Sequence, residues 1–146
     1  MRLTFPGALA ALLFAAFCSP AMASDEPLAV RCPGETTIEI DDCLGQQLRG
    51  AQARLDKYLR AAIERYPEEK PAVRLGIEAS EKAFEAYREI ECSTVYEDWK
   101  DGTIRGAMNL GCRIRLTDER TRTVWANWLQ YMDSTPPILP EPKATN

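Results

Sequence analysis

The cysteines are the side chains with the most specific chemistry in this 146-residue sequence. Four of them follow the first 23 residues: Cys32, Cys43, Cys92 and Cys112. The chain has no histidine and no C-x-x-C pair, the features typical of zinc sites and redox thiols. Four cysteines in an exported chain indicate two disulfides. Three pairings are possible, and we favour Cys32 with Cys43 and Cys92 with Cys112, because each pair flanks a non-helical segment. No metal or cofactor is expected.

The lack of histidine also limits catalysis. Ser-His-Asp and Cys-His nucleophile pairs are excluded, as is an imidazole general base. Paired carboxylates remain available, but a glycosidase needs a substrate cleft that a small helical core hardly provides. We therefore expect a binding protein and not an enzyme.

Residues 1–23 are typical of a secretory signal peptide. They carry one early positive charge, an apolar run over residues 8–17 that is too short for a membrane span, and a small-x-small ending at residues 21–23. Lipid attachment at Cys18 is the competing interpretation, but the bulky Phe17 precedes that cysteine. We predict cleavage after Ala23 and a periplasmic or secreted protein.

The chain that remains after cleavage is acidic. It has 17 basic and 22 acidic residues, a net charge of about −5. This balance does not favour nucleic acid or an anionic membrane as a partner, and it permits a cationic protein. Residues 66–101 carry most of the negative charge, and residues 102–146 are net positive.

Apolar spacing of three and four residues predicts three helices. The first runs from Asp41 or Asp42 to Pro67, the second from Pro71 toward Cys92 and Val95, and the third across residues 107–132. Thr117 either lies inside the third helix or caps a helix that begins at residue 118, which would give four helices. The predicted fold is an all-α, antiparallel bundle with two disulfides.

The segments outside these helices have distinct compositions. "ETTIEI", before Asp41, is compatible with a short extended segment. Residues 133–146 hold four prolines, so we expect an extended or disordered tail that does not pack. The predicted domain is therefore residues 24–132. Within it, Arg113, Arg120 and Arg122 are expected to pair with glutamates of the second helix. The outward face of that helix holds Glu78, Glu81, Glu85 and Glu89.

The segment between the second pair of cysteines is typical of a recognition loop. "VYEDWKDGT", residues 95–103, places aromatic and acidic side chains between bridged ends. The candidate contact residues are Tyr96, Glu97, Asp98, Trp99 and Asp101. The alternative is that Trp99 packs on the core and the acids only keep the loop soluble.

Two motifs resemble the LprI-type lysozyme inhibitor domain family of exported bacterial helical proteins. One is Tyr87, Arg88, Glu89, Glu91 and Cys92, and the other is Cys112, Leu116, Thr117 and Arg120, with Asp101, Gly102 and Thr103 between them. The sequence differs mildly from the family pattern, for example with Phe84 where a Trp is common. The resemblance spans Cys32 to about Trp128 and implies a helical fold.

The same resemblance implies a function. An acidic, disulfide-fixed surface would be attracted to a basic lysozyme and block it. The alternative is a cell-envelope interaction module, with an unknown partner and no lysozyme inhibition. Arg88, Glu91, Thr117 and Arg120 are interpreted as a scaffold that positions the second and third helices.

Overall fold

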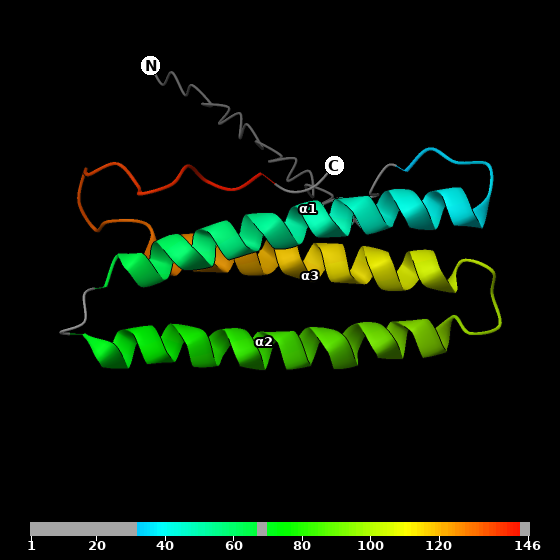
Figure 1. Cartoon of the computed structure of the whole chain (residues 1–146), viewed down its shortest axis with the longest axis horizontal. Coiled ribbons are helices and arrows are strands. Elements are labelled where there is room, and N and C mark those ends of the chain that lie inside the picture. Colours follow the sequence, from blue (N-terminus) through cyan, green and yellow to red (C-terminus); the bar gives the residue numbers. More distant parts are fainter. Residues whose placement is uncertain (1–31, 67–69, 144–146) are drawn as a thin grey trace, which may run out of the picture.

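Three antiparallel helices form the bundle in a computed structural model that describes residues 32–66 and 70–143 (Figure 1). They are α1 (Thr37–Glu64), α2 (Pro71–Asp98) and α3 (Arg105–Trp128). α3 packs along both other helices, whereas α1 and α2 contact each other little. The predicted three-helix bundle is confirmed. The predicted signal peptide and the lipidation alternative lie outside the described residues.

The core consists of two clusters along α3. The larger cluster joins Leu55, Tyr58 and Ala62 of α1 to residues of the other two helices, and the smaller surrounds the Cys92–Cys112 disulfide. Phe84 of α2 packs against both clusters. α2 itself buries only Ile77 and Cys92 fully, so most of its surface faces outward.

Both predicted disulfides are confirmed. The Cα atoms are 5.7 Å apart in Cys32–Cys43 and 5.6 Å apart in Cys92–Cys112. The first bridge ties the segment before α1 to the second turn of that helix. The second joins the last two turns of α2 to α3, so it fixes the hairpin that these helices form.

The start of α1 differs from the prediction. We expected the helix to begin near Asp41 after a short extended segment, but it begins at Thr37 with Thr36 as its N-cap. The Glu39 backbone N–H donates to Oγ1 of Thr36, and the Glu39 carboxylate accepts from the backbone N–H groups of Glu35 and Thr36. This capping box satisfies amides at the helix start that would otherwise lack partners, and it overrides the β-branched composition of "TTIEI".

The capping box should give a measurable pH dependence to stability. The backbone hydrogen bonds from Thr36 and then Glu35 hold the pKa of Glu39 below its ordinary value of 4.5. Because the folded pKa is depressed, the stabilisation is complete above the unfolded pKa and is lost as the pH falls through the folded pKa. We expect Glu39→Gln to destabilise the protein at neutral pH and to cost less in acid.

Urea denaturation of both proteins at neutral pH and at a pH below the folded pKa of Glu39 measures this difference. Because the other carboxyl groups titrate in both proteins, the difference in unfolding free energy between the variant and the wild type reports the contribution of Glu39. An equal loss of stability at the two pH values would contradict the prediction.

α2 is longer than expected, and α3 begins two residues earlier and ends four residues earlier than expected. α2 continues past Val95 to Asp98, and α3 runs without a break through Thr117. Thr117 is not a cap, because its buried hydroxyl donates to the carbonyl of Arg113 one turn earlier. The possibility of a fourth helix is therefore wrong.

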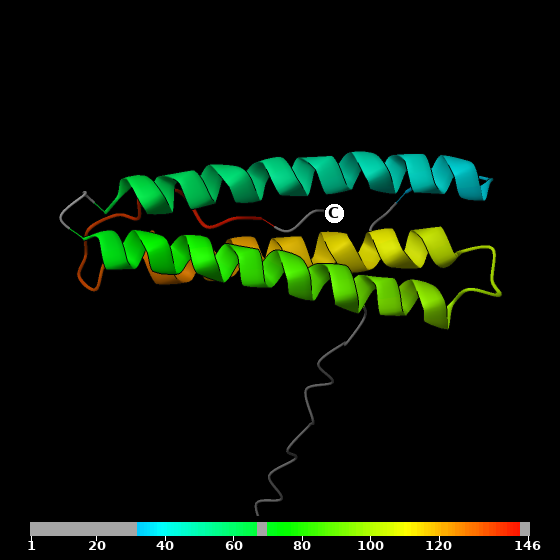
Figure 2. The same cartoon turned by 60° about the horizontal axis from the view of Figure 1, so that its bottom comes forward.

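Residues 133–143 of the proline-rich tail are extended, as expected, but they pack on the bundle, which corrects the prediction (Figure 2). The Ile138 N–H donates to the Leu129 carbonyl, and the tail carbonyls of Leu139 and Pro140 accept from the side chains of α3 and α1 respectively. The donors are Trp125 Nε1 at 2.9 Å and the Tyr58 hydroxyl at 2.7 Å. Leu139 packs against the larger core cluster. Proline prevents helix formation here, but it does not prevent an extended strap from docking.

Candidate binding surface at the acidic end of the bundle

The predicted recognition loop is partly helical. Residues 95–98 form the last turn of α2, and only residues 99–104 make the connection to α3. Tyr96 and Trp99 are 38% and 39% exposed. Trp99 is therefore neither buried in the core nor fully in water. Glu97, Asp98 and Asp101 are exposed, so all five candidate contact residues reach the surface.

Hydrogen bonds hold this connection in place. Arg105 Nε donates to the Tyr96 hydroxyl at 2.9 Å, and another guanidinium nitrogen of Arg105 donates to the carbonyl of Lys100. The Gly102 N–H donates to the Trp99 carbonyl at 2.9 Å, which closes the turn. Thr103 is exposed beside it. A partner that docks here would meet a surface that is already ordered.

The first turns of α1 lie at the same end of the bundle, which the sequence did not reveal (Figure 1). The Asp41 carboxylate lies directly against the backbone of Gly106. A hollow of about 480 Å³ lies between the two segments. It is lined by Thr37, Asp41, Tyr96, Thr103, Arg105 and Gly106. We call residues 35–42 together with residues 96–105 the acidic end.

The acidic end concentrates negative charge and exposed apolar side chains. Ile38 of α1 is 73% exposed, and Ile104, in the same connection as Trp99, is 40% exposed. The acidic end holds seven acidic residues and two basic residues: Glu35, Glu39, Asp41, Asp42, Glu97, Asp98 and Asp101, with Lys100 and Arg105. The acidic residues of its α1 half are visible in the sequence as "ETTIEIDD". They did not stand out because basic residues farther along α1 offset most of their charge when residues 24–65 are summed.

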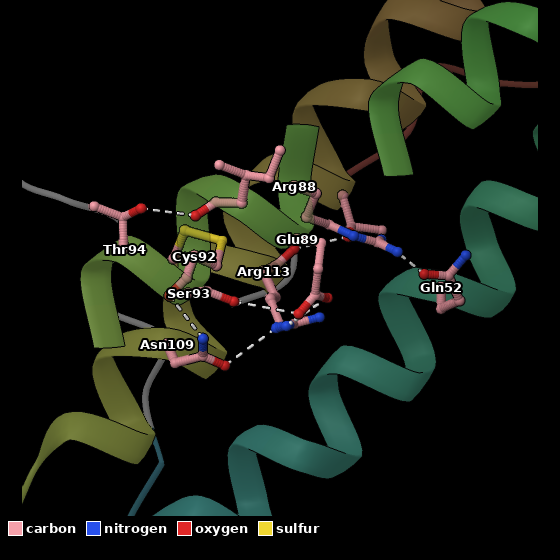
Figure 3. Close-up of polar contacts among 11 residues, drawn as sticks. Gln52, Arg88, Glu89, Cys92, Ser93, Thr94, Asn109 and Arg113 are labelled. Atoms are coloured by element: carbon pink, nitrogen blue, oxygen red, sulfur yellow. Dashed lines mark hydrogen bonds and ion pairs between the residues drawn. A yellow bond between two sulfur atoms is a disulfide. The ribbon is translucent and has the colours of Figure 1, made fainter. Parts of the chain in front are cut away.

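The predicted scaffold residues fall into two groups, those that connect the helices and those that are exposed. Arg88 donates to Oγ1 of Thr117 at 2.7 Å and to Oε1 of Gln52 at 2.8 Å, so it links all three helices (Figure 3). Arg120 donates to Glu81 and to Ser80 of α2. Leu116 is buried beside the Cys92–Cys112 disulfide. The other motif residues of α2, Tyr87, Glu89 and Glu91, are exposed.

The predicted ion pairs between α2 and α3 are partly correct. Arg120 pairs with Glu81 at 2.9 Å, and Arg113 pairs with Glu89 at 2.7 Å. The hydrogen bond and charge of Arg113 hold the pKa of Glu89 below its ordinary value. Arg122 instead pairs with Glu141 of the tail, so that prediction is wrong. The tail competes for this arginine because it packs along the bundle.

Comparison with known proteins places this scaffold in a family. The family model described as "Lysozyme inhibitor LprI" matches residues 31–124. The chain belongs to the LprI lysozyme inhibitor family. Both disulfides and both halves of the acidic end lie within the part that matches the LprI model, whereas the packed tail lies after it. Neither the curated proteins nor the solved structures contain a match.

Membership of the LprI family suggests a role in protein binding. The family is one of inhibitors, not a known family of enzymes. Within residues 32–66 and 70–143, no group of cysteine and carboxylate side chains is arranged to hold a metal ion. In the same part of the chain, none of the helices is both long and apolar enough to cross a membrane.

Proposed function

We propose that this protein works outside the cytoplasm and inhibits a basic lysozyme by binding it through the acidic end. The observation that carries this proposal is that the two segments of the acidic end, each held by a disulfide, together present seven acids and the exposed side chains of Tyr96, Trp99 and Ile38. Disulfides form and persist in oxidising compartments. The family description supports lysozyme as the partner.

The physical basis is electrostatic attraction followed by apolar contact. Animal-type lysozymes are strongly basic, so the acidic end would raise the rate of encounter. Trp99 and Tyr96 are already positioned and have few rotatable bonds, so little conformational freedom is lost when they become buried against a partner. The acids around them would remain at the rim of the contact, where charge contributes more to the association rate than to affinity.

A cell-wall lysis assay tests the proposal. The full chain, with both disulfides formed, is mixed in excess with an animal-type lysozyme at low ionic strength, and the clearing of a suspension of bacterial cell walls is followed. We expect slower lysis, with less inhibition as salt is added because salt screens the attraction. If excess protein leaves the lysis rate unchanged at low salt, the proposal is wrong.

Two variants of the acidic end should weaken inhibition in different ways. Trp99→Ala is expected to weaken inhibition by about tenfold, because a central aromatic contact is lost. The triple variant Glu97→Gln, Asp98→Asn and Asp101→Asn is expected to slow association and to flatten the salt dependence. Association kinetics with immobilised lysozyme at several salt concentrations measure both effects.

A matched control removes three exposed acids that lie elsewhere. The substitutions Glu64→Gln, Glu78→Gln and Glu85→Gln change the net charge by the same amount without touching the acidic end. This control should bind nearly as fast as the wild type. If the control loses as much binding as the triple variant, net charge alone controls association and the acidic end is not the contact surface.

A further inference from the structure

Three arginines from three helices line one small cavity beside the bundle core. The cavity has a volume of about 220 Å³. It is lined by Leu48, Arg49 and Gln52 of α1, Arg88 of α2 and Arg113 of α3. Figure 3 shows Arg88 reaching from α2 toward Gln52 of α1, with Glu89 of α2 and Arg113 of α3 nearby. No acidic side chain lines the cavity.

The arginines of this cavity have few anionic partners. In the described part of the chain, Arg88 donates to two neutral oxygens, those of Gln52 and Thr117, and its guanidinium also lies over the Phe84 ring at 5.3 Å. Arg49 is exposed and has no hydrogen-bond acceptor within the described part of the chain. By contrast, the half-buried Arg54 and Arg120 each pair with a carboxylate.

Within the described residues, Glu89 is the carboxylate that pairs with an arginine of this cavity. Its carboxylate accepts from Arg113, and the charge of Arg88 also helps to lower its pKa. Gln52 is held from its other side, because its Nε2 donates to Asp56, so its Oε1 is turned toward Arg88. Three guanidinium groups, with Glu89 bonded to Arg113 and Asp56 bonded to Gln52, leave a net charge of +1 around the cavity, in a protein that is acidic overall.

We propose that this cavity binds a dianionic oxyanion of the phosphate class. Guanidinium groups present planar pairs of N–H donors that match the oxygens of such anions. Arg88, fixed by Thr117, Gln52 and Phe84, would form the preorganised wall, and Arg49 would close over the ligand from α1. The site lies apart from the acidic end and does not depend on lysozyme binding.

Isothermal titration of the full, oxidised chain with inorganic phosphate tests this proposal. Titrations run at neutral pH and constant ionic strength, so that general screening does not change. We expect one bound phosphate per chain, with affinity weakened by about tenfold in Arg49→Gln, because one charged donor is removed. Arg49→Gln is chosen because Arg49 is exposed and its loss should not unfold the protein. Arg113→Gln is a second variant with the same expected direction.

Control titrations test whether phosphate binding depends on this cavity and on the charge of the ligand. Arg60→Gln removes the same charge from an exposed position of α1 outside the cavity and should bind phosphate like the wild type. If glycerol phosphate binds as tightly as inorganic phosphate, the cavity recognises the phosphate group of a monoester. If glycerol phosphate binds more weakly, the ligand is the free phosphate ion. Acetate that binds as tightly as phosphate would overturn the dianion assignment. Absence of phosphate binding to the wild type, or equal losses in Arg60→Gln and Arg49→Gln, would overturn the site itself.

Discussion

Replacing Cys92 and Cys112 together by alanine is expected to lower the free energy of unfolding by about 3 kcal/mol. The bridge closes a segment with a sequence separation of 20, so its loss gives the unfolded chain much more conformational freedom. Cys92 is fully buried and packs with Leu116 and Cys112, so its removal also leaves a small void. Urea denaturation of the oxidised wild type and the double variant measures the difference.

The other disulfide provides the matched comparison. Cys32→Ala with Cys43→Ala opens a bridge with a sequence separation of 11, at the edge of the bundle and outside both core clusters. We expect a smaller loss of stability, because the loop is shorter and no core packing is lost. A larger loss from this pair than from Cys92 and Cys112 would contradict our account of the α2–α3 hairpin.

Deleting residues 137–146 is expected to lower the free energy of unfolding by about 2 kcal/mol. Burial of Leu139 should contribute about 2 kcal/mol and the two side-chain hydrogen bonds to the tail about 1 kcal/mol each. The conformational freedom lost by the docked tail opposes these terms. Trp125 and Tyr58 would then face water, so a change in tryptophan fluorescence should accompany the loss of stability.

A shorter deletion separates the docked residues from the rest of the tail. Removing residues 144–146 leaves Ile138, Leu139 and Pro140 with their partners. This control should unfold at the same urea concentration as the wild type. If the two deletions have equal effects, the contacts of Leu139 and Pro140 do not stabilise the bundle.

The helical fold was predictable because apolar residues recur on one face along each helix. Leu55, Tyr58 and Ala62 are among the residues that gave the pattern in α1, and all three are buried. The start of α1 was missed because the cap at Thr36 depends on a reciprocal pair of hydrogen bonds, which outweighs β-branched composition. The docked tail was missed because its contacts join residues nine or more positions apart, such as Tyr58 and Pro140.

Of the two segments that form the acidic end, one was predicted from the sequence. Tyr96 to Asp101 stood out because cysteines flank a segment rich in acids and aromatic residues. The contribution of Ile38 and Asp41 depends on which helix ends meet in space, and local sequence does not specify that. The arginine cavity was not predicted at all, because Arg49, Arg88 and Arg113 are far apart in the sequence and only the packing of three helices brings them together.

The path of the docked tail determines where an attached label or surface linker would leave the molecule. From the end of α3 the chain turns back, so that Pro140 contacts Tyr58, in the C-terminal half of α1, and Glu141 pairs with Arg122. The acidic end lies at the opposite end of the bundle (Figure 1). A tether joined after Lys143 would therefore leave the molecule along the flank of the bundle and not from the acidic end.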